Sequence, residues 1–220
     1  MHKLLLPPLA ALALGLAVPA QLQTFAMSSE RASTMLAAFD TTNFTSPGWA
    51  TITYGQPVWK ADYDAMAEKL KGQAARLGKD NWTTFEASVD VKFGSTKVPA
   101  GSYCLAIACS KGGEWSLLFL STADILKDKM MPHMTTDLIA AGKAKPVVTV
   151  PLTEAKAEKS AEKLTIEFAS DNKAIGSGSL SITWGMHKVT TPVACEIAAD
   201  AKKAEAKDAG AGKGDKNEKK

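Results

Sequence analysis

Histidine is scarce in this chain of 220 residues, which contains only His2, His133 and His187. The sequence also lacks a Gly-x-Ser-x-Gly nucleophile motif, a His-Glu-x-x-His zinc motif, a Cys-x-x-Cys pair and a glycine loop for phosphate. These absences argue against the enzyme classes that carry those motifs. A Ser/His/Asp triad that assembles only in space leaves no such signature, so a hydrolase of unrecognised type stays open.

A surplus of one charge is missing from most of the chain. The formal net charge is +3, but residues 21–197 hold 18 basic and 18 acidic residues. The surplus therefore lies in Lys3 and in the lysine-rich segment 198–220. This balance does not predict electrostatic steering toward nucleic acid or an anionic membrane.

The first twenty residues are typical of a secretory signal peptide. They contain one basic residue, Lys3, and a short apolar run over residues 9–18 that ends in "VPA". We predict cleavage after Ala20, with Ala26 as the second choice. The run is too short for a membrane anchor and prolines interrupt the apolar sequence on both sides of it, and no cysteine follows it to carry a lipid. The sequence thus predicts an exported, soluble protein, periplasmic or extracellular, with no integral membrane segment after processing.

The predicted domain covers residues 30–197, after a linker at residues 21–29. Residues 198–220 contain nothing apolar larger than alanine. Such a segment buries too little surface to offset its ordering entropy, so we predict a disordered tail.

The chain has only three cysteines, Cys104, Cys109 and Cys195. The first two fall on one predicted strand, roughly 16 Å apart at the usual strand rise. A disulfide needs Cα atoms within about 7 Å. Cys195 can therefore pair with either of them, which leaves at least one thiol unpaired.

Alternation of apolar and polar residues dominates the middle of the sequence. Over residues 85–93 the apolar residues point one way and the charged ones the other, as in an antiparallel strand with one wet face. Residues 102–109 and 114–121 are apolar almost throughout and flank "SKGG", which predicts a central hairpin covered on both faces. We interpret the hairpin as the wall behind a site.

Helical spacing is convincing in one place, residues 62–77. Met66, Leu70, Ala74 and Leu77 form one stripe, with Asp62 as the N-cap. A shorter helix is expected within residues 121–133. Short strands beside one principal amphipathic helix predict a mainly β fold, an antiparallel β-sandwich or jelly-roll-like domain.

Several segments resemble a known family. They are "RAS" (31–33), "ITYGQP" (52–57), "KVPAGSYCL" (97–105), "EWSLLF" (114–119), "LTIEFAS" (164–170) and "LSITWGMHKVTTPV" (180–193). In this order they resemble exported bacterial proteins of domain-of-unknown-function family 2911, over about residues 31–195. The resemblance implies a β-sandwich-like domain without an established activity.

Two motifs of that family contain polar and aromatic residues that do not follow the strand alternation. The first is "YGQPVWKAD" (54–62), where Gln56 and Asp62 replace two family arginines. The second is "ARLGKDNWT" (75–83), where Ala75, Asp80 and Asn81 replace a tryptophan, an asparagine and a glutamate. The ligand-binding residues that we predict come from these motifs: Tyr54, Lys60, Arg76, Asp80, Asn81 and Trp82.

Five tryptophans suggest a glycan-binding surface, because sugar-binding β-sandwiches use exposed aromatic platforms. Trp115 and Trp184 lie in apolar strand patterns, so we assign them to the core. Trp59 and Trp82 lie in the two polar motifs, where exposure on a binding surface and packing at strand ends both stay open.

Methionines cluster in "KMMPHMTTD" (129–137). Thioether and imidazole groups are ligands that suit Cu(I), and the candidate ligands are Met130, Met131, His133 and Met134. The alternative is a helix end that packs methionines against the sheet.

The sequence favours a non-enzymatic binding module for a glycan, a peptide or another small ligand, with no cofactor. The two alternatives are a periplasmic copper-handling protein and an unrecognised hydrolase.

Overall fold

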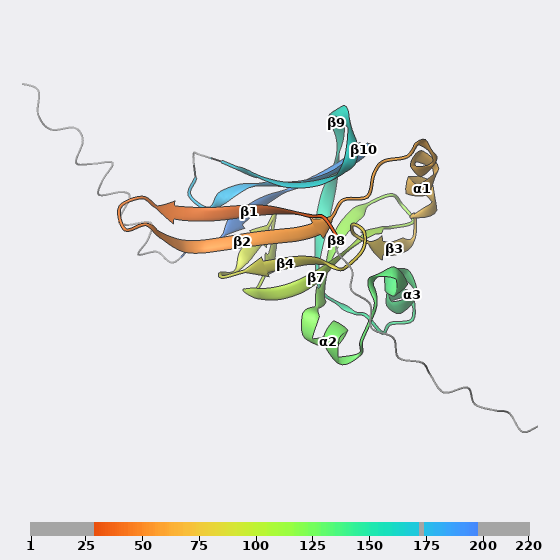
Figure 1. Cartoon of the computed structure of the whole chain (residues 1–220), viewed down its shortest axis with the longest axis horizontal. Helices are drawn as coiled ribbons and strands as arrows, with labels where there is room; N and C mark the ends of the chain where they lie inside the picture. Colours follow the sequence, from red (N-terminus) through yellow and green to blue (C-terminus); the bar gives the residue numbers. More distant parts are fainter. Residues whose placement is uncertain (1–28, 172–173, 198–220) are drawn as a thin grey trace, which may run out of the picture.

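The computed structural model describes residues 29–171 and 174–197, so the predicted signal peptide and tail lie outside the described residues. It confirms a mainly β fold in which every strand ladder is antiparallel. The strands run in the order β1-β2-β4-β7-β8-β9-β10-β5-β6, with β3 paired to β7. This continuous sheet folds over on itself into two layers (Figure 1).

The first layer carries the hairpin that the sequence predicts. Its strands are β1 (Arg31–Asp40), β2 (Thr45–Gly55), β3 (Gln73–Arg76), β4 (Thr83–Ala87), β7 (Gly101–Cys109) and β8 (Trp115–Ser121). β3 and β4 follow one another along the same edge of β7, where β4 pairs with residues 101–105 and β3 with residues 106–109. The loop between β3 and β4 is the second polar motif.

The second layer is built from β5 (Val91–Phe93), β6 (Thr96–Val98), β9 (Pro146–Ser170) and β10 (Ser177–Cys195). β9 is 25 residues long and belongs to both layers. Its residues 146–152 pair with β8 and its residues 153–170 pair with β10. Residues 146–170 therefore form one strand that crosses between the layers.

The stretch at residues 85–93 also crosses between layers. The structure divides it into β4 and β5, but Phe85, Val91 and Phe93 all remain in the same core. That core lies between the two layers, and its largest fully buried members include Phe85, Phe93 and Phe119. Because both layers face it, the alternation continues through the bend.

The β7–β8 hairpin is buried on both faces, as predicted. Leu105, Leu117 and Phe119 point into the core between the layers. Cys104 and Leu118 point the other way, into a second apolar cluster beneath the helices. These helices are α2 (Thr122–Lys127), η2 (Pro132–Met134) and α3 (Thr135–Ala140). Ser121 caps α2 by accepting a hydrogen bond from the backbone N–H of Asp124 at 3.2 Å.

The predicted helix at residues 62–77 is wrong in its second half. The structure has a short turn of helix, η1 (Ala61–Tyr63), followed by α1 (Asp64–Lys69). Gly72 then takes a positive φ of 78°, and the chain turns into β3. β3 pairs with the edge of β7 that β4 leaves open, and Ala74 and Leu77 are buried from this extended segment. Sheet pairing thus overrides helical spacing here.

All three cysteines are buried and unpaired, so the described structure contains no disulfide between them. Burial raises the pKa of each thiol above its usual range, which keeps the thiols neutral.

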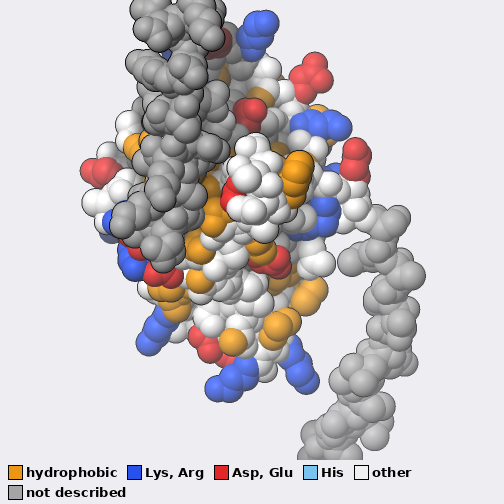
Figure 2. Space-filling view, turned by 90° about the vertical axis from the view of Figure 1, so that its left-hand side faces the viewer, with side chains coloured by type: hydrophobic (Ala, Val, Ile, Leu, Met, Phe, Trp, Pro, Cys, Tyr) orange, Lys and Arg blue, Asp and Glu red, His pale blue; other side chains and the backbone are white. Residues whose placement is uncertain are grey.

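The described surface carries both signs of charge. On the face at the β1–β2 turn, lysine, arginine and acidic side chains are interspersed with apolar ones (Figure 2). No helix within the described residues is long and apolar enough to cross a membrane.

Candidate functional site: an aromatic pocket

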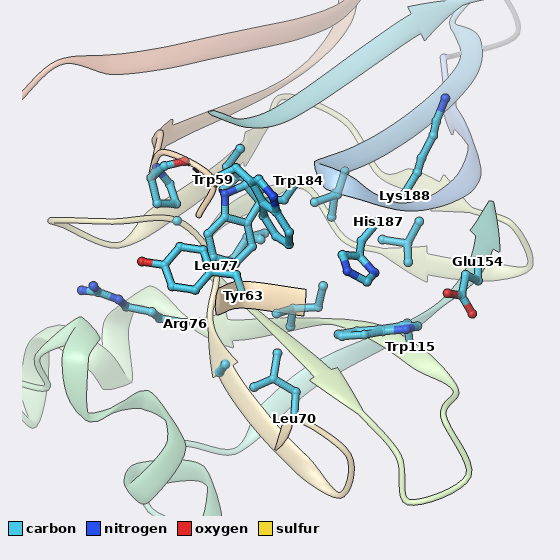
Figure 3. A pocket seen from close by; sticks show the side chains of 17 residues that line it. Trp59, Tyr63, Leu70, Arg76, Leu77, Trp115, Glu154, Trp184, His187 and Lys188 are labelled. Atoms are coloured by element: carbon cyan, nitrogen blue, oxygen red, sulfur yellow. Dashed lines mark hydrogen bonds between the residues drawn. The ribbon is translucent and has the colours of Figure 1, made fainter. Parts of the chain in front are cut away.

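A pocket of about 290 Å³ lies where β3, β7 and β8 approach β9 and β10. Aromatic and aliphatic side chains make up most of its lining. The lining includes Trp59, Tyr63, Trp115 and Trp184 (Figure 3). They come from four places in the chain: the segment after β2, η1, β8 and β10. The pocket therefore exists only in the folded protein.

Three of these rings pack together into an aromatic wall, Trp59–Tyr63–Trp184. The centroids of Trp59 and Trp184 are 5.1 Å apart with edge-to-face geometry, and those of Tyr63 and Trp184 are 4.7 Å apart. Trp184 is fixed further, since its indole N–H donates to the carbonyl of Pro57 at 3.1 Å. Edge-to-face packing of this kind stabilises ring clusters beyond the area they bury.

Gly185 makes room for the aromatic wall. It has a positive φ of 60°, and a Cβ at this position would lie 2.6 Å from Cδ2 of Trp59. The β9–β10 ladder shifts register on both sides of Gly185. The irregularity lets the indole of Trp59 lie against the backbone of β10.

The floor of the pocket comes from the β7–β8 hairpin. Ile107 and Trp115 line the pocket from β7 and β8. Trp115 pairs with Cys109 on one side and Leu152 of β9 on the other, so its backbone is held at both edges. In Figure 3 its ring lies apart from the aromatic wall, below His187. The β7–β8 hairpin, interpreted from the sequence as the structure behind a site, thus also contributes Trp115 to the site.

The cover of the pocket is the segment of residues 60–71, which contains η1 and α1. Tyr63 and Leu70 line the pocket from this segment. Asp64 is linked to His187 on β10 by an Oδ1–Nε2 contact of 3.2 Å. The His187 ring also lies 5.6 Å from that of Trp59. Between its two ends, this polar contact and the ring contacts of Tyr63 help to hold the cover over the pocket.

Charged side chains lie at the ends of the pocket. Arg76, the last residue of β3, is near the hydroxyl end of Tyr63, whereas Glu154 lies at the far end beside Trp115 (Figure 3). Lys188 also belongs to the lining. Within the described residues, the side chains of the three form no hydrogen bond and no ion pair. The charges of Arg76 and Glu154 are available to a ligand.

The predicted ligand-binding residues do not converge on one point. Arg76 lines the pocket. Lys60, Asp80 and Asn81 are exposed outside the lining, and Asp80 lies 3.9 Å from Lys79 in a surface ion pair. The remaining two, Tyr54 and Trp82, are buried.

Tyr54 and Trp82 have structural surroundings. The Tyr54 hydroxyl donates to the carbonyl of Ile166 at 3.1 Å and accepts from its N–H at 2.9 Å, which ties β2 to β9. Trp82 packs in the cluster beneath the helices, and its indole N–H donates to the carbonyl of Met130 at 3.3 Å. The interpretation of Trp82 as packed at a strand end is therefore the correct one.

The assignment of Trp115 and Trp184 to the core was incomplete. Both pack against the core but are only partly buried, and both line the pocket. Trp115 comes just after the hairpin turn and Trp184 just before Gly185, which interrupts the alternation. Those two signals could have separated pocket tryptophans from core tryptophans.

The candidate copper ligands are divided between core and surface. Met130 is buried beside Trp82, whereas Met131, His133 and Met134 are exposed. A site that used all four would require Met130 to leave the core. Among the described residues there is no group of three or more His, Cys, Asp or Glu side chains that could hold a metal ion.

The comparisons with known proteins give a family and no relative of established function. The model of DUF2911, described as a protein of unknown function, matches residues 41–193. That span includes the aromatic wall, the floor and the cover. Searches of the curated proteins and of the solved structures gave no match.

Proposed function

The chain belongs to the DUF2911 family of proteins of unknown function, and we propose that its aromatic pocket binds a short saccharide without catalysing a reaction on it. The observation that carries the proposal is the pocket itself, in which tryptophans stand on two sides of a small apolar cavity. As an expectation from the sequence, the protein meets this ligand in the periplasm or outside the cell.

The volume of the pocket supports a ligand of one or two rings. Small-molecule sites usually begin at about 300 Å³, and an apolar cavity of about 150 Å³ holds one benzene. At about 290 Å³, this pocket has room for roughly two rings of six atoms. A folded peptide or a long glycan would exceed it, so a monosaccharide or disaccharide is the class that fits.

The lining supports a ring with apolar faces and polar edges. The C–H faces of a pyranose pack well on indole rings, which offer a broad apolar surface. Trp115 on the floor and the aromatic wall opposite would contact the two faces of such a ring. Arg76 and Glu154, at the two ends, remain for its hydroxyl groups.

The absence of reactive pairs in the lining favours binding over hydrolysis. Glu154 is the only carboxylate among the residues that line the pocket, whereas glycoside hydrolysis ordinarily uses two. His187 and Asp64 resemble the base and orienting acid of a triad, but no Ser, Thr or Cys lines the pocket to act as nucleophile.

Tryptophan fluorescence and calorimetry on the purified protein test the proposal. A panel of neutral and acidic mono- and disaccharides is titrated, and at least one is expected to give saturable quenching and a matching heat of binding. Trp115→Ala should abolish both signals, because it removes one side of the pocket. Trp49→Phe is the matched control, since Trp49 is partly buried on β2 and does not line the pocket. If no saccharide binds, or if Trp115→Ala binds as well as the parent, the proposal is wrong.

A further inference from the structure

The unused polar groups of the pocket are mostly hydrogen-bond donors. Trp184 and His187 are already engaged, with Pro57 and Asp64. Four other donor groups belong to lining residues and have no hydrogen-bond partner within the described chain: the indole N–H of Trp59 and of Trp115, the hydroxyl of Tyr63 and the guanidinium of Arg76. The ammonium of Lys188 points away from the aromatic rings (Figure 3). Glu154 is the one carboxylate that faces them as an acceptor.

This excess of donors restricts the ligand. A neutral sugar hydroxyl is donor and acceptor at once, so it leaves such an excess unbalanced. A carboxylate accepts several hydrogen bonds and donates none, and bonds from a charged donor are the stronger ones. The inventory therefore favours a ligand that carries a carboxylate.

Arg76 is the residue placed to receive that carboxylate. The β3–β7 ladder fixes its backbone opposite Ala106. In Figure 3 its guanidinium points toward the same end of the pocket as the hydroxyl of Tyr63. A guanidinium presents two parallel N–H groups that match a carboxylate. Glu154 at the other end of the pocket would repel the same group, so the two charges together define the direction in which a ligand lies.

From this arrangement we infer that the ligand is an acidic saccharide of the uronic acid type. Its sugar ring stacks between the aromatic wall and Trp115, and its carboxylate binds to Arg76. The inference rests on the proposed function, since it specifies the class of saccharide that the pocket takes.

The test uses disaccharides in pairs of identical linkage, one neutral and one with a carboxylate at C6 of one ring. In calorimetry at low salt, the acidic member is expected to bind at least tenfold more tightly. Arg76→Gln should remove this preference, so that the two members bind with affinities within about twofold of each other. Added salt should shrink the preference, because it screens the charge interaction.

Two further variants control the experiment. Lys79→Gln removes a neighbouring cation that pairs with Asp80 outside the pocket, so it should leave the preference unchanged. Glu154→Gln removes the repelling carboxylate and should strengthen binding of the acidic member.

The outcomes separate the two proposals. Equal binding of both members overturns the inference and leaves saccharide binding intact. A preference that survives Arg76→Gln also overturns it, because the carboxylate then binds elsewhere. If neither member binds, the proposed function fails as well.

Discussion

The floor and the cover of the pocket are held in different ways. Both strands of the β7–β8 hairpin pair with neighbours on two edges and are buried on two faces. The cover is held mainly by backbone hydrogen bonds at its ends. The N–H of Trp59 donates to the carbonyl of Glu162 at 2.7 Å, and the N–H of Gly72 donates to the carbonyl of Cys109 at 2.8 Å. Between those points η1 has no buried residue, and the side chains of Asp64 and His187 are 69% and 42% exposed.

This difference separates stability from access to the pocket. Local opening is easiest where few apolar contacts and few protected hydrogen bonds hold a segment. Substitutions in the floor should therefore lower the free energy of unfolding of the whole domain. Substitutions in the cover should change how fast the pocket opens and leave the rest of the fold in place.

The largest effect is expected for Phe119→Ala in the floor. Phe119 is fully buried and its ring contacts those of Phe85, Phe93 and Tyr103. Truncation leaves a cavity and should lower the free energy of unfolding by about 3–5 kcal/mol. Urea denaturation followed by tryptophan fluorescence measures the loss. A loss below about 1 kcal/mol would mean that the floor is no more firmly held than the cover.

Trp82→Ala should come next, at about 3 kcal/mol. Trp82 joins the back of the hairpin to the segment before η2, through its packing and its hydrogen bond to Met130. Asn81→Ala is the matched control, because the neighbouring side chain is exposed and should cost less than about 0.5 kcal/mol. Equal effects of the two substitutions in the same urea experiment would contradict the structural role of Trp82.

Part of the fold could be predicted from the alternation of apolar and polar residues. The alternation identified residues that face the core, and it did so correctly for Phe85, Val91 and Phe93. It could not tell which layer a strand pairs with, because both layers face one core and the pattern continues through the bend. For that reason the sequence could not predict that residues 85–93 are divided between β4 and β5, or that residues 146–170 form one strand.

The site was harder to predict than the fold. Arg76 was identified because it stood outside the alternation in a polar motif. Trp115 and Trp184 were missed because half of each side chain belongs to the core, and a tryptophan can serve core and pocket at once. Tyr63 was not predicted as a site residue, because helical spacing in that segment indicated a stripe of other residues, from Met66 to Leu77. Only the packing of distant segments brings these rings together.

A smaller effect on stability is expected for Asp64→Ala in the cover. The substitution removes the contact with His187, and an exposed pair of this kind contributes at most about 1 kcal/mol. Hydrogen exchange of the backbone amides in residues 61–71 should nevertheless become faster, while exchange in β7 and β8 stays unchanged. Asp62→Ala is the matched control, since Asp62 is exposed in η1 and its side chain forms no ion pair within the described part of the chain. Exchange that is the same in both variants would contradict the role of Asp64 in holding the cover.

The smallest effect is expected where exposed charges join β5 and β6 to the end of β10. Lys97 pairs with Asp90 at 2.7 Å and with Glu196 at 2.9 Å. The hydrogen bond from Lys97 lowers the pKa of Asp90, and those from Lys92 and Lys97 lower the pKa of Glu196. When folding lowers the pKa of a carboxyl group, the charged carboxylate stabilises the protein at pH values above the pKa of the unfolded state, which is about 4. This contribution disappears as the pH falls through the lower pKa of the folded state.

Lys97→Ala should therefore lower the melting temperature slightly at pH 6, and the difference from the parent should vanish as the pH approaches 3. Added salt should shrink the difference at pH 6, because these charges lie at the surface, as do those of Asp64 and His187 in the cover. Lys92→Ala offers a comparison within the same network, since Lys92 has one ion-pair partner among the described residues, Glu196 at 2.6 Å, and should have a smaller effect. A melting temperature difference that stays the same down to pH 3 would contradict this linkage. It would mean that Lys97 stabilises the two layers through the packing of its aliphatic chain, so that an exposed residue acts like the floor and unlike the cover.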